Sequence, residues 1–234
     1  MPEASVIRSM FEGVAPRYDL LNRVLSLGID RSWRRSVVKM LGLEPQHRVL
    51  DLCCGTGDLA LEIAPHASCI GCDFTWSMLR RAKVKATRQT RRLQLAVADA
   101  LELPFADGSF DRVTVAFGVR NLEDMREGFR EMLRVLKPGG VLAILEFSQP
   151  TASWLRAPYR FYLDRLLPTV GQLLSRRGDA YRYLAESIAG FPEPAVLTST
   201  LDGAGFIEVG FVRLTGGIVA VHRARKPDQA RMSR

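Results

Sequence analysis

Long apolar runs are missing from this chain of 234 residues, and so is a hydrophobic leader. No stretch approaches the roughly 20 apolar residues that a membrane-spanning helix needs, because charged residues, proline or glycine interrupt every run. The N-terminus has no charged lead followed by an apolar block, which excludes a typical secretory signal. These absences predict a cytoplasmic protein, and the 47% apolar content favours a globular chain over a disordered one.

Cysteine is scarce as well. The four cysteines fall at Cys53, Cys54, Cys69 and Cys72, inside two regions predicted to be buried strands. A disulfide framework is typical of short secreted chains, so we expect free, buried thiols. Cys69 and Cys72 have C-x-x-C spacing, but no second pair of ligands has the spacing of a zinc site. The sequence therefore predicts no metal site.

Acidic residues are fewer than basic ones. The chain has 33 Lys and Arg and 25 Asp and Glu, which gives a net charge of +8. Such an excess indicates a polyanion nearby, either nucleic acid or an anionic lipid surface, without distinguishing the two. The basic residues cluster in 31–35, 80–92 and 223–226. Each cluster alone is also typical of a solvated helix face.

The pattern of apolar residues divides the chain into a helical start and an alternating α/β part. Helical spacing predicts helices over about 5–42. From residue 48 onward, short apolar runs alternate with helical stretches, which is typical of βαβ units around a parallel sheet. The expected strands are 49–52, 69–72, 93–97, 113–117, 141–145, 206–213 and 216–222, and the expected helices lie near 57–65, 75–87 and 123–136.

Three further segments complete this predicted organisation. Lys137–Gly140 is expected to end a helix and turn tightly into the next strand. A helical insertion over about 152–190 precedes the last two strands. We expect one domain over 1–226 and a flexible polar tail over 227–234.

A glycine-rich loop, Asp51–Asp58, lies where the first strand turns into a helix. Gly55 and Gly57 let the backbone approach a ligand, and the amides of the helix N-terminus can receive a carboxylate. Gly55-x-Gly57-x-x-Ala60 also fits the dinucleotide fingerprint, so an NAD-dependent oxidoreductase is one alternative. Its short-chain form needs a Tyr-x-x-x-Lys pair, and no tyrosine here has a lysine four residues later.

Three carboxylates lie at or just past the ends of successive expected strands. Asp51 suits an ammonium group, Asp73 can accept from both ribose hydroxyls, and Asp99 can accept from an adenine amino group. For each acid alone, a helix cap or a strand end is the plain alternative. A ligand with a carboxylate, an ammonium group, ribose and adenine but no phosphate matches the set better than NAD. The sequence therefore predicts S-adenosylmethionine as the cofactor.

Several other segments resemble the ubiquinone/menaquinone biosynthesis C-methyltransferase family of class I methyltransferases. They include Phe117–Leu122, Leu136–Gly140, Tyr183–Ile188 and Leu214–Ile218, and the resemblance covers about 6–226. It implies a Rossmann-like α/β fold with a mostly parallel seven-stranded sheet of order 3-2-1-4-5-7-6, flanked by helices. The predicted cofactor-binding residues are Asp51, Gly55, Thr56, Gly57, Asp73, Met78, Asp99, Ala100, Ala116 and Phe117.

Ala116 departs from the family pattern. Members often carry serine at this position, so any side-chain hydrogen bond to the cofactor is lost here. Contact through the backbone can persist.

The resemblance implies C-methylation of a reduced quinone ring that carries a polyprenyl tail. Demethylmenaquinol is the favoured substrate, and the benzoquinol of ubiquinone biosynthesis is the alternative. A neutral quinol is a poor carbon nucleophile, so loss of a proton with a pKa of about 10 needs help. Arg120 is predicted to stabilise the phenolate, Asn121 to hold a water that relays the proton, and Tyr18 to orient ring or water.

Residues 154–167 mix aromatics, leucines and arginines at helical spacing. Such a segment can lie in a membrane interface or cover a lipid-binding cleft, while an amphipathic core helix is the plain alternative. Together with the positive charge, it predicts peripheral contact with anionic lipid at the inner face of the plasma membrane. The oligomeric state stays open, a homodimer included.

Two further classes of protein fit parts of the sequence. A nucleic-acid methyltransferase fits the charge, but Phe117–Arg120 stands where amino-directed enzymes carry an Asn/Asp-Pro-Pro-Tyr-type motif, and no cysteine lies there to attack a pyrimidine. No nucleic-acid partner is therefore expected. A binding module without activity is disfavoured by the intact loop and acids. Of the three histidines, none stands where a general base is expected.

Overall fold

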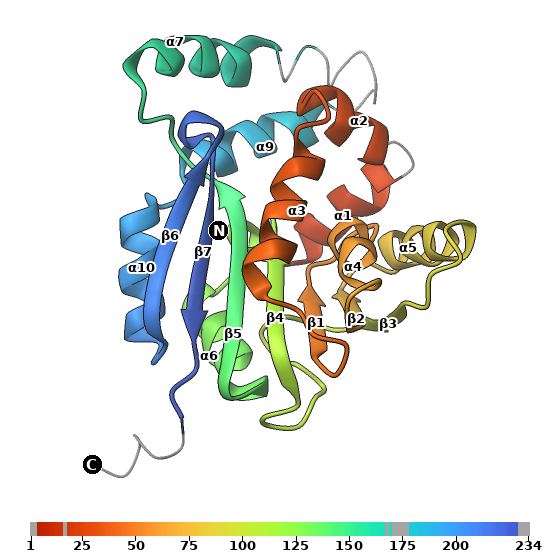
Figure 1. Cartoon of the computed structure of the whole chain (residues 1–234). Helices are drawn as coiled ribbons and strands as arrows, with labels where there is room; N and C mark the ends of the chain where they lie inside the picture. Colours follow the sequence, from red (N-terminus) through yellow and green to blue (C-terminus); the bar gives the residue numbers. More distant parts are fainter. Residues whose placement is uncertain (1–3, 16–17, 167–168, 170–177, 229–234) are drawn as a thin grey trace.

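The computed structural model describes residues 4–15, 18–166, 169 and 178–228. Their strands form a sheet of order β3-β2-β1-β4-β5-β7-β6, in which β7 runs antiparallel to both neighbours and the other pairs are parallel (Figure 1). The predicted Rossmann-like methyltransferase topology is thus confirmed. The strands are β1 Arg48–Leu52, β2 Ser68–Asp73, β3 Gln94–Val97, β4 Phe110–Ala116, β5 Leu136–Phe147, β6 Ile207–Leu214 and β7 Val219–Arg225.

Helices cover both faces of the sheet, and the strands are apolar on both sides as a result. Successive residues of β1 enter different cores: Val49 packs with Trp33 and Ile63, whereas Leu50 packs on the other side with Phe129. The covering helices are α3 Asp30–Leu41 and α4 Asp58–Ile63 on one face, and α6 Met125–Val135 and α10 Pro194–Gly203 on the other, with α5 Trp76–Arg88 packed beside β2 and β3.

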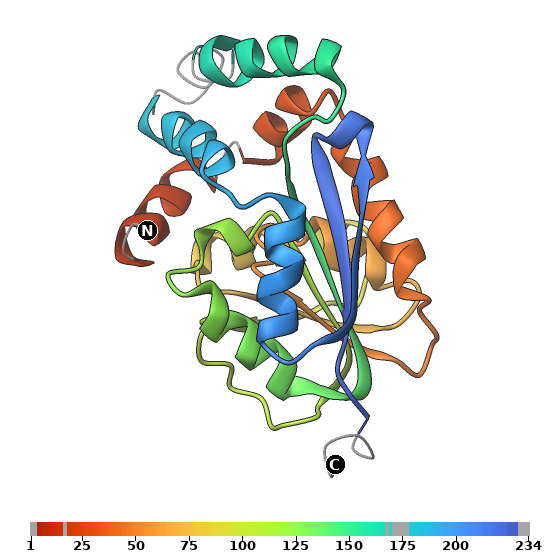
Figure 2. The same ribbon diagram turned by 90° about the vertical axis from the view of Figure 1, so that its left-hand side faces the viewer.

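Four helices lie over the end of the sheet at which β5 finishes, and we call them the helical cap (Figures 1 and 2). They are α1 Ala4–Val14, α2 Tyr18–Leu25, α7 Ser153–Phe161 and α9 Gly178–Ala189. A π-helical turn, η3 (Tyr162–Leu166), follows α7, and the Tyr162 hydroxyl donates a hydrogen bond of 2.8 Å to the carbonyl of Leu25. The cap therefore joins parts of the chain that are more than a hundred residues apart.

The structure differs from the sequence expectations in β5, in β7, which begins at Val219 after a 3₁₀ turn, and in an additional helix, α10. Strand β5 already begins at Leu136, so the expected turn Lys137–Gly140 lies inside it, next to a register shift opposite β4. Gly139 has a φ of +75°, which permits this irregularity within a strand. Helix α10 was not expected, although Pro194 in its first turn is typical of a helix start.

The predicted N-terminal helical region contains α1, α2 and α3, and the predicted insertion contains α7, η3 and α9. Residues 167–168 and 170–177 of that insertion, and 229–234 of the predicted tail, lie outside the described residues. Within the described ranges, every helix is too short or too polar to cross a membrane.

Candidate active site

Two cavities meet at the carboxyl ends of the parallel strands. The first, the carboxylate cavity, has an empty volume of about 810 Å³ and includes Asp73 and Asp99 in its lining. The second, the apolar cavity, has an empty volume of about 1530 Å³ and lies under the helical cap. Phe11, Tyr18 and Phe117 line both, so a ligand in one can touch a ligand in the other.

A smaller cavity of about 390 Å³ leads to Asp51, and Tyr18, Gly55 and Phe117 line it together with the carboxylate cavity. Asp51 is the register partner of Thr114, whose hydroxyl donates to Asp51 Oδ1 at 2.7 Å. Asp51 Oδ2 is buried and has no hydrogen-bond partner. Burial raises the pKa of this carboxyl to about 7. A positively charged ligand group would satisfy Oδ2 and stabilise the ionised form.

Asp73 ends β2 and fixes the glycine loop. Its Oδ2 accepts from the Gly55 amide and its Oδ1 from the Thr75 amide, both at 2.8 Å. Burial raises the pKa of Asp73, and these backbone hydrogen bonds oppose the rise. Because each carboxylate oxygen can accept more than one hydrogen bond, Asp73 can still accept from a ligand in the carboxylate cavity.

The predicted residues that follow β3 also reach the carboxylate cavity. Asp99 is exposed, and its Oδ1 accepts from the Leu101 amide at 2.9 Å. Ala100 and the buried Met78 of α5 line the same cavity and supply apolar contact. The three side chains thus surround a space with one polar edge, as a nucleobase requires.

Not every predicted cofactor residue lines this space. Gly57 has a φ of +82° before α4, and a Cβ there would stand 3.0 Å from the Cβ of Ala82, so it serves helix packing. Thr56 lines only the smaller cavity. Ala116 lines both the carboxylate and the smaller cavity, and Phe117, with a φ of +58°, lines all three.

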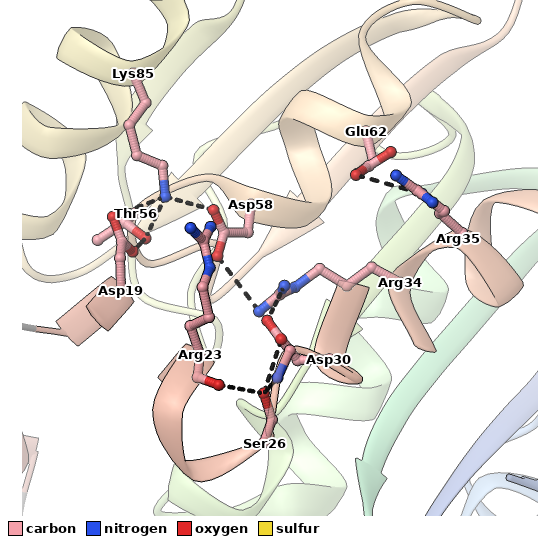
Figure 3. Close-up of polar contacts among 11 residues, drawn as sticks. Asp19, Arg23, Ser26, Asp30, Arg34, Arg35, Thr56, Asp58, Glu62 and Lys85 are labelled. Atoms are coloured by element: carbon pink, nitrogen blue, oxygen red, sulfur yellow. Dashed lines mark hydrogen bonds and ion pairs between the residues drawn. The ribbon is translucent and has the colours of Figure 1, made fainter. Parts of the chain in front are cut away.

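A polar network fastens the cap to the glycine loop (Figure 3). Lys85 of α5 donates to Thr56 Oγ1 at 2.9 Å and to Asp19 Oδ2 at 3.0 Å, and it also contacts Asp58. Arg34 of α3 pairs with Asp58 at 3.4 Å and with Asp30 at 2.5 Å. Cap helix α2 and the loop beside Asp51 are therefore held to each other through shared charges.

Arg120 lies in a short 3₁₀ helix, η2 (Val119–Asn121), and lines the apolar cavity. It is only 9% exposed, and its Nη1 donates to Glu146 Oε1 at 2.8 Å and to the Phe117 carbonyl at 2.5 Å. Its Nε is buried without a partner. Burial raises the pKa of Glu146, and the Arg120 charge opposes this rise. The sequence prediction missed Glu146, although an acid inside the apolar run of β5 was a visible signal.

Asn121 faces the carboxylate cavity, and its Oδ1 accepts a 2.9 Å hydrogen bond from the Tyr183 hydroxyl of α9. Tyr183 lines the apolar cavity and was also missed by the sequence prediction. Tyr18 lines all three cavities at the start of α2. Burial raises the pKa of its hydroxyl, and Asn22 and the Arg120 charge oppose the rise. The three predicted catalytic side chains therefore gather where the cavities meet.

Cys53, Cys54 and Cys72 line the carboxylate cavity or the smaller cavity, and burial raises the pKa of each of these thiols. All four cysteines are free, but Cys53 and Cys54 lie half-buried in the loop after β1, not in a strand as expected, because β1 ends at Leu52. His222 is buried in β7 with Nε2 3.0 Å from the Pro194 carbonyl, and burial lowers its pKa. In the described ranges, no three Cys, His, Asp or Glu residues group as metal ligands.

Comparisons with known proteins agree with this architecture. The model of the ubiE/COQ5 methyltransferase family matches residues 2–226. A "Ubiquinone/menaquinone biosynthesis C-methyltransferase UbiE" of Geobacter sp. (strain M21) is 49% identical over 226 residues, which is 94% of this chain and 96% of the relative. A "Demethylmenaquinone methyltransferase" of Thermus thermophilus is 47% identical over 93% of this chain and 100% of the relative.

Solved structures with lower identity share the fold. A SAM-dependent methyltransferase of Thermotoga maritima has a TM-score of 0.67 and 20% identity, covering 93% of this chain and 98% of that one. A SAM-dependent methyltransferase of Aquifex aeolicus has a TM-score of 0.62 and 19% identity, covering 82% and 89%. Since a family model and close relatives span nearly its whole length, the chain belongs to the ubiE/COQ5 methyltransferase family and is an S-adenosylmethionine-dependent C-methyltransferase.

Proposed function

We propose that the protein methylates a ring carbon of a polyprenylated quinol, and that its substrate is demethylmenaquinol. The observation that carries the proposal is the joining of a large apolar cavity, which suits a prenylated ring, to the carboxylate cavity through Phe11, Tyr18 and Phe117. Relatives called demethylmenaquinone methyltransferase at 46–47% identity support the naphthoquinol. Relatives named for both quinones, at 49%, keep the benzoquinol as the second candidate.

S-adenosylmethionine fits the residues around the carboxylate cavity. It would supply a methyl group made electrophilic by the sulfonium to which it is bound. In this proposal the orphaned Oδ2 of Asp51 accepts from the ammonium group, Asp73 binds the ribose hydroxyls and Asp99 the adenine amino group. Gly55, Thr56 and Gly57 shape the loop, while Met78, Ala100, Ala116 and Phe117 supply contacts to the nucleoside and the methionine part.

We assign to Arg120 the stabilisation of the phenolate form of the quinol substrate. Once a quinol hydroxyl loses its proton, charge spreads to the neighbouring ring carbon, which then becomes nucleophilic. The guanidinium keeps its own proton, and its free Nε can donate to the phenolate oxygen in a site shielded from water. Glu146 already offsets the charge of Arg120, so stabilisation rests on this directed donor more than on net charge.

Asn121 and Tyr18 complete the assignment. The Tyr183 hydroxyl occupies Asn121 Oδ1, which leaves the Asn121 Nδ2 group to donate to a water that accepts the quinol proton. Tyr18 lines the passage between the cavities and orients the ring against the methyl donor. Alignment of the two reacting groups supplies rate by proximity.

The deciding experiment measures quinones in cells. Deleting the gene from a host that makes menaquinone should lead to accumulation of demethylmenaquinone, identified by its mass, and the intact gene should reverse it. The purified enzyme should methylate reduced, but not oxidised, demethylmenaquinone. Accumulation of an unmethylated benzoquinone instead would favour the ubiquinone step, and an unchanged quinone profile would contradict the proposal.

We also propose that the cap contacts the inner face of the plasma membrane, from the cytoplasm, to take up its lipid substrate. Large apolar side chains are exposed on or beside α2 and α7, including Leu27 at 85%, Trp154 at 75% and Phe161 at 58%. Arg160 is exposed on the same helix as Trp154. Apolar insertion together with attraction to anionic lipid is typical of peripheral membrane proteins.

Vesicle flotation tests the membrane proposal. A Leu27→Ser/Trp154→Ser variant should bind vesicles containing phosphatidylglycerol about tenfold more weakly than the unchanged protein, because two exposed apolar groups no longer insert. Val212→Ser, which removes an exposed valine from β6, is the matched control and should bind normally. High salt should weaken binding, and binding indifferent to salt would remove the electrostatic part of the proposal.

A further inference from the structure

Two buried polar atoms without a partner belong to side chains that line the apolar cavity. They are Nε of Arg120 and the hydroxyl oxygen of Tyr159. A buried polar group that lacks a hydrogen bond destabilises the protein, so such groups call for a partner. The Arg120 atom already has a proposed ligand in the phenolate. The Tyr159 hydroxyl has none.

Tyr159 is held by its ring, not by its hydroxyl. It is 7% exposed on α7, packs with Leu163 and Ile188, and stacks on Tyr162 at 6.4 Å between ring centroids. The neighbouring tyrosines both use their hydroxyls within the protein: Tyr162 donates to Leu25 and Tyr183 donates to Asn121. Tyr18 also lines this cavity, and its hydroxyl has a side-chain hydrogen bond with Asn22. Of the four cavity-lining tyrosines in the described chain, Tyr159 therefore has the hydroxyl that stays available to a ligand.

A quinol ring presents two oxygens, on opposite sides of the ring, and both lose water when the ring enters an apolar cavity. Arg120 can serve only the oxygen next to the carbon that reacts. The other oxygen would then lie unpaired among apolar side chains, and the flat ring could also turn until the wrong carbon faced the methyl donor. A second donor at the far side would correct both problems.

We infer that the Tyr159 hydroxyl donates a hydrogen bond to this second quinol oxygen and thereby selects a para-quinol in one orientation. The inference rests on the proposed function and extends it to a residue outside the predicted catalytic set. Burial and, to a smaller extent, the neighbouring Tyr162 raise the pKa of Tyr159, while the Arg120 charge opposes the rise, so the hydroxyl remains a donor throughout the working pH range.

Paired substrates and paired variants test the inference. One substrate is demethylmenaquinol with a short prenyl tail, and the other is the same molecule without the second hydroxyl. Tyr159→Phe should lower kcat/KM for the quinol by about threefold to tenfold, the usual effect of losing one neutral hydrogen bond, and leave the mono-hydroxy analogue nearly unaffected. Tyr162→Phe is the matched control and should change both substrates alike, because its hydroxyl contacts the backbone.

Equilibrium binding gives a second measurement that needs no turnover. The oxidised quinone still accepts hydrogen bonds, so Tyr159→Phe should weaken its binding by a similar factor. The melting temperature of the ligand-free protein should be unchanged or higher, because the variant removes a buried hydroxyl that has no partner. Equal losses for both substrates, or no loss for either, would overturn the inference. If the unchanged protein binds the quinone but methylates neither substrate, the proposed function fails, while the binding comparison still decides the role of Tyr159.

Discussion

The carboxylate cavity and the apolar cavity take their lining residues from different kinds of structure. The first, together with the smaller cavity that leads to Asp51, takes its polar groups from successive strand ends, where β1, β2 and β3 deliver Asp51, Asp73 and Asp99 to one edge of the sheet. The second is enclosed by helices from both ends of the chain, such as α2 and α9. A parallel sheet fixes the first arrangement by its topology, whereas packing between distant segments fixes the second. In the proposed function, binding of the methyl donor and choice of acceptor are therefore separable.

The polar network around Lys85 qualifies that separation. It joins Asp19 of the cap to Thr56 and Asp58 of the glycine loop (Figure 3). A displacement of the glycine loop should therefore also move α2, which lines the apolar cavity. The comparison can be tested by removing groups from one cavity, from the other and from the link between them.

The largest effect is expected from Arg120→Ala in the apolar cavity. Turnover at saturating substrate should fall by about 10²–10³-fold, because a directed donor to the developing phenolate is lost, while affinity for S-adenosylhomocysteine should stay nearly unchanged. Unchanged turnover would remove Arg120 from the mechanism. Steady-state kinetics and calorimetry measure the two quantities.

Loss of Arg120 also leaves Glu146 buried without its charge partner, which can destabilise the fold by about 3–5 kcal/mol. The double variant Arg120→Gln/Glu146→Gln removes both charges and serves as the control. It should recover most of the free energy of unfolding and none of the activity. Recovery of activity along with stability would mean that Arg120 acts only on folding.

An intermediate effect is expected from Asp51→Asn in the smaller cavity beside the carboxylate cavity. In the unchanged protein, affinity for S-adenosylhomocysteine should rise by up to roughly 30-fold between pH 5.5 and 8. The reason is that the Asp51 carboxyl ionises at about pH 7 and only the ionised form pairs with the ammonium group. The variant should lose most of this pH dependence, and Asp73, whose pKa is also raised, accounts for the remainder. Calorimetry across this pH range measures the affinity of both proteins for S-adenosylhomocysteine.

The stability of the ligand-free protein should show the opposite dependence on pH. The unfolded chain releases the Asp51 proton near pH 4, whereas the folded chain keeps it to about pH 7, so the folded state binds more protons between these values and loses stability as the pH rises. Asp111→Asn is the matched control, because this acid binds Lys137 at the far end of β4. If Asp51→Asn and Asp111→Asn change the pH dependence of stability alike, the role of Asp51 is contradicted.

The smallest effect is expected from Lys85→Met in the link. Dissociation constants for S-adenosylhomocysteine and KM for the quinol should both rise by about threefold to tenfold, because α2 and the loop lose a shared cation. Lys83→Met, on the exposed side of the same helix, should change neither. A change in only one of the two constants would show that the cavities are independent.

The sequence was most informative for the carboxylate cavity. Glycines and acids placed after apolar runs predict a strand-end site because chain order and sheet position are linked in a parallel α/β fold. Gly57 shows the limit of this reasoning: its loop lies beside the cavity, but the residue packs α4 against α5 and does not line the cavity. A motif indicates which loop binds, and only packing decides which of its residues touch the ligand.

The apolar cavity was much harder to predict. Glu146, Tyr159 and Tyr183 come from β5, α7 and α9, and their meeting around Arg120 and Asn121 depends on how the cap docks. No local periodicity encodes contacts between segments so far apart. Helix α10 was missed for another reason: its apolar residues do not keep to one face, since Leu197 and Leu201 are buried while Val196 is exposed.

The reversed direction of β7 has a practical consequence. Since it runs against β5, its last residue, Arg225, lies beside Val141, at the end of the sheet opposite the two cavities (Figure 1). Material attached beyond residue 228 would start from that far end. Anchoring the enzyme to a sensor surface through its C-terminus should therefore leave the cap facing outward, free to meet vesicles or quinone.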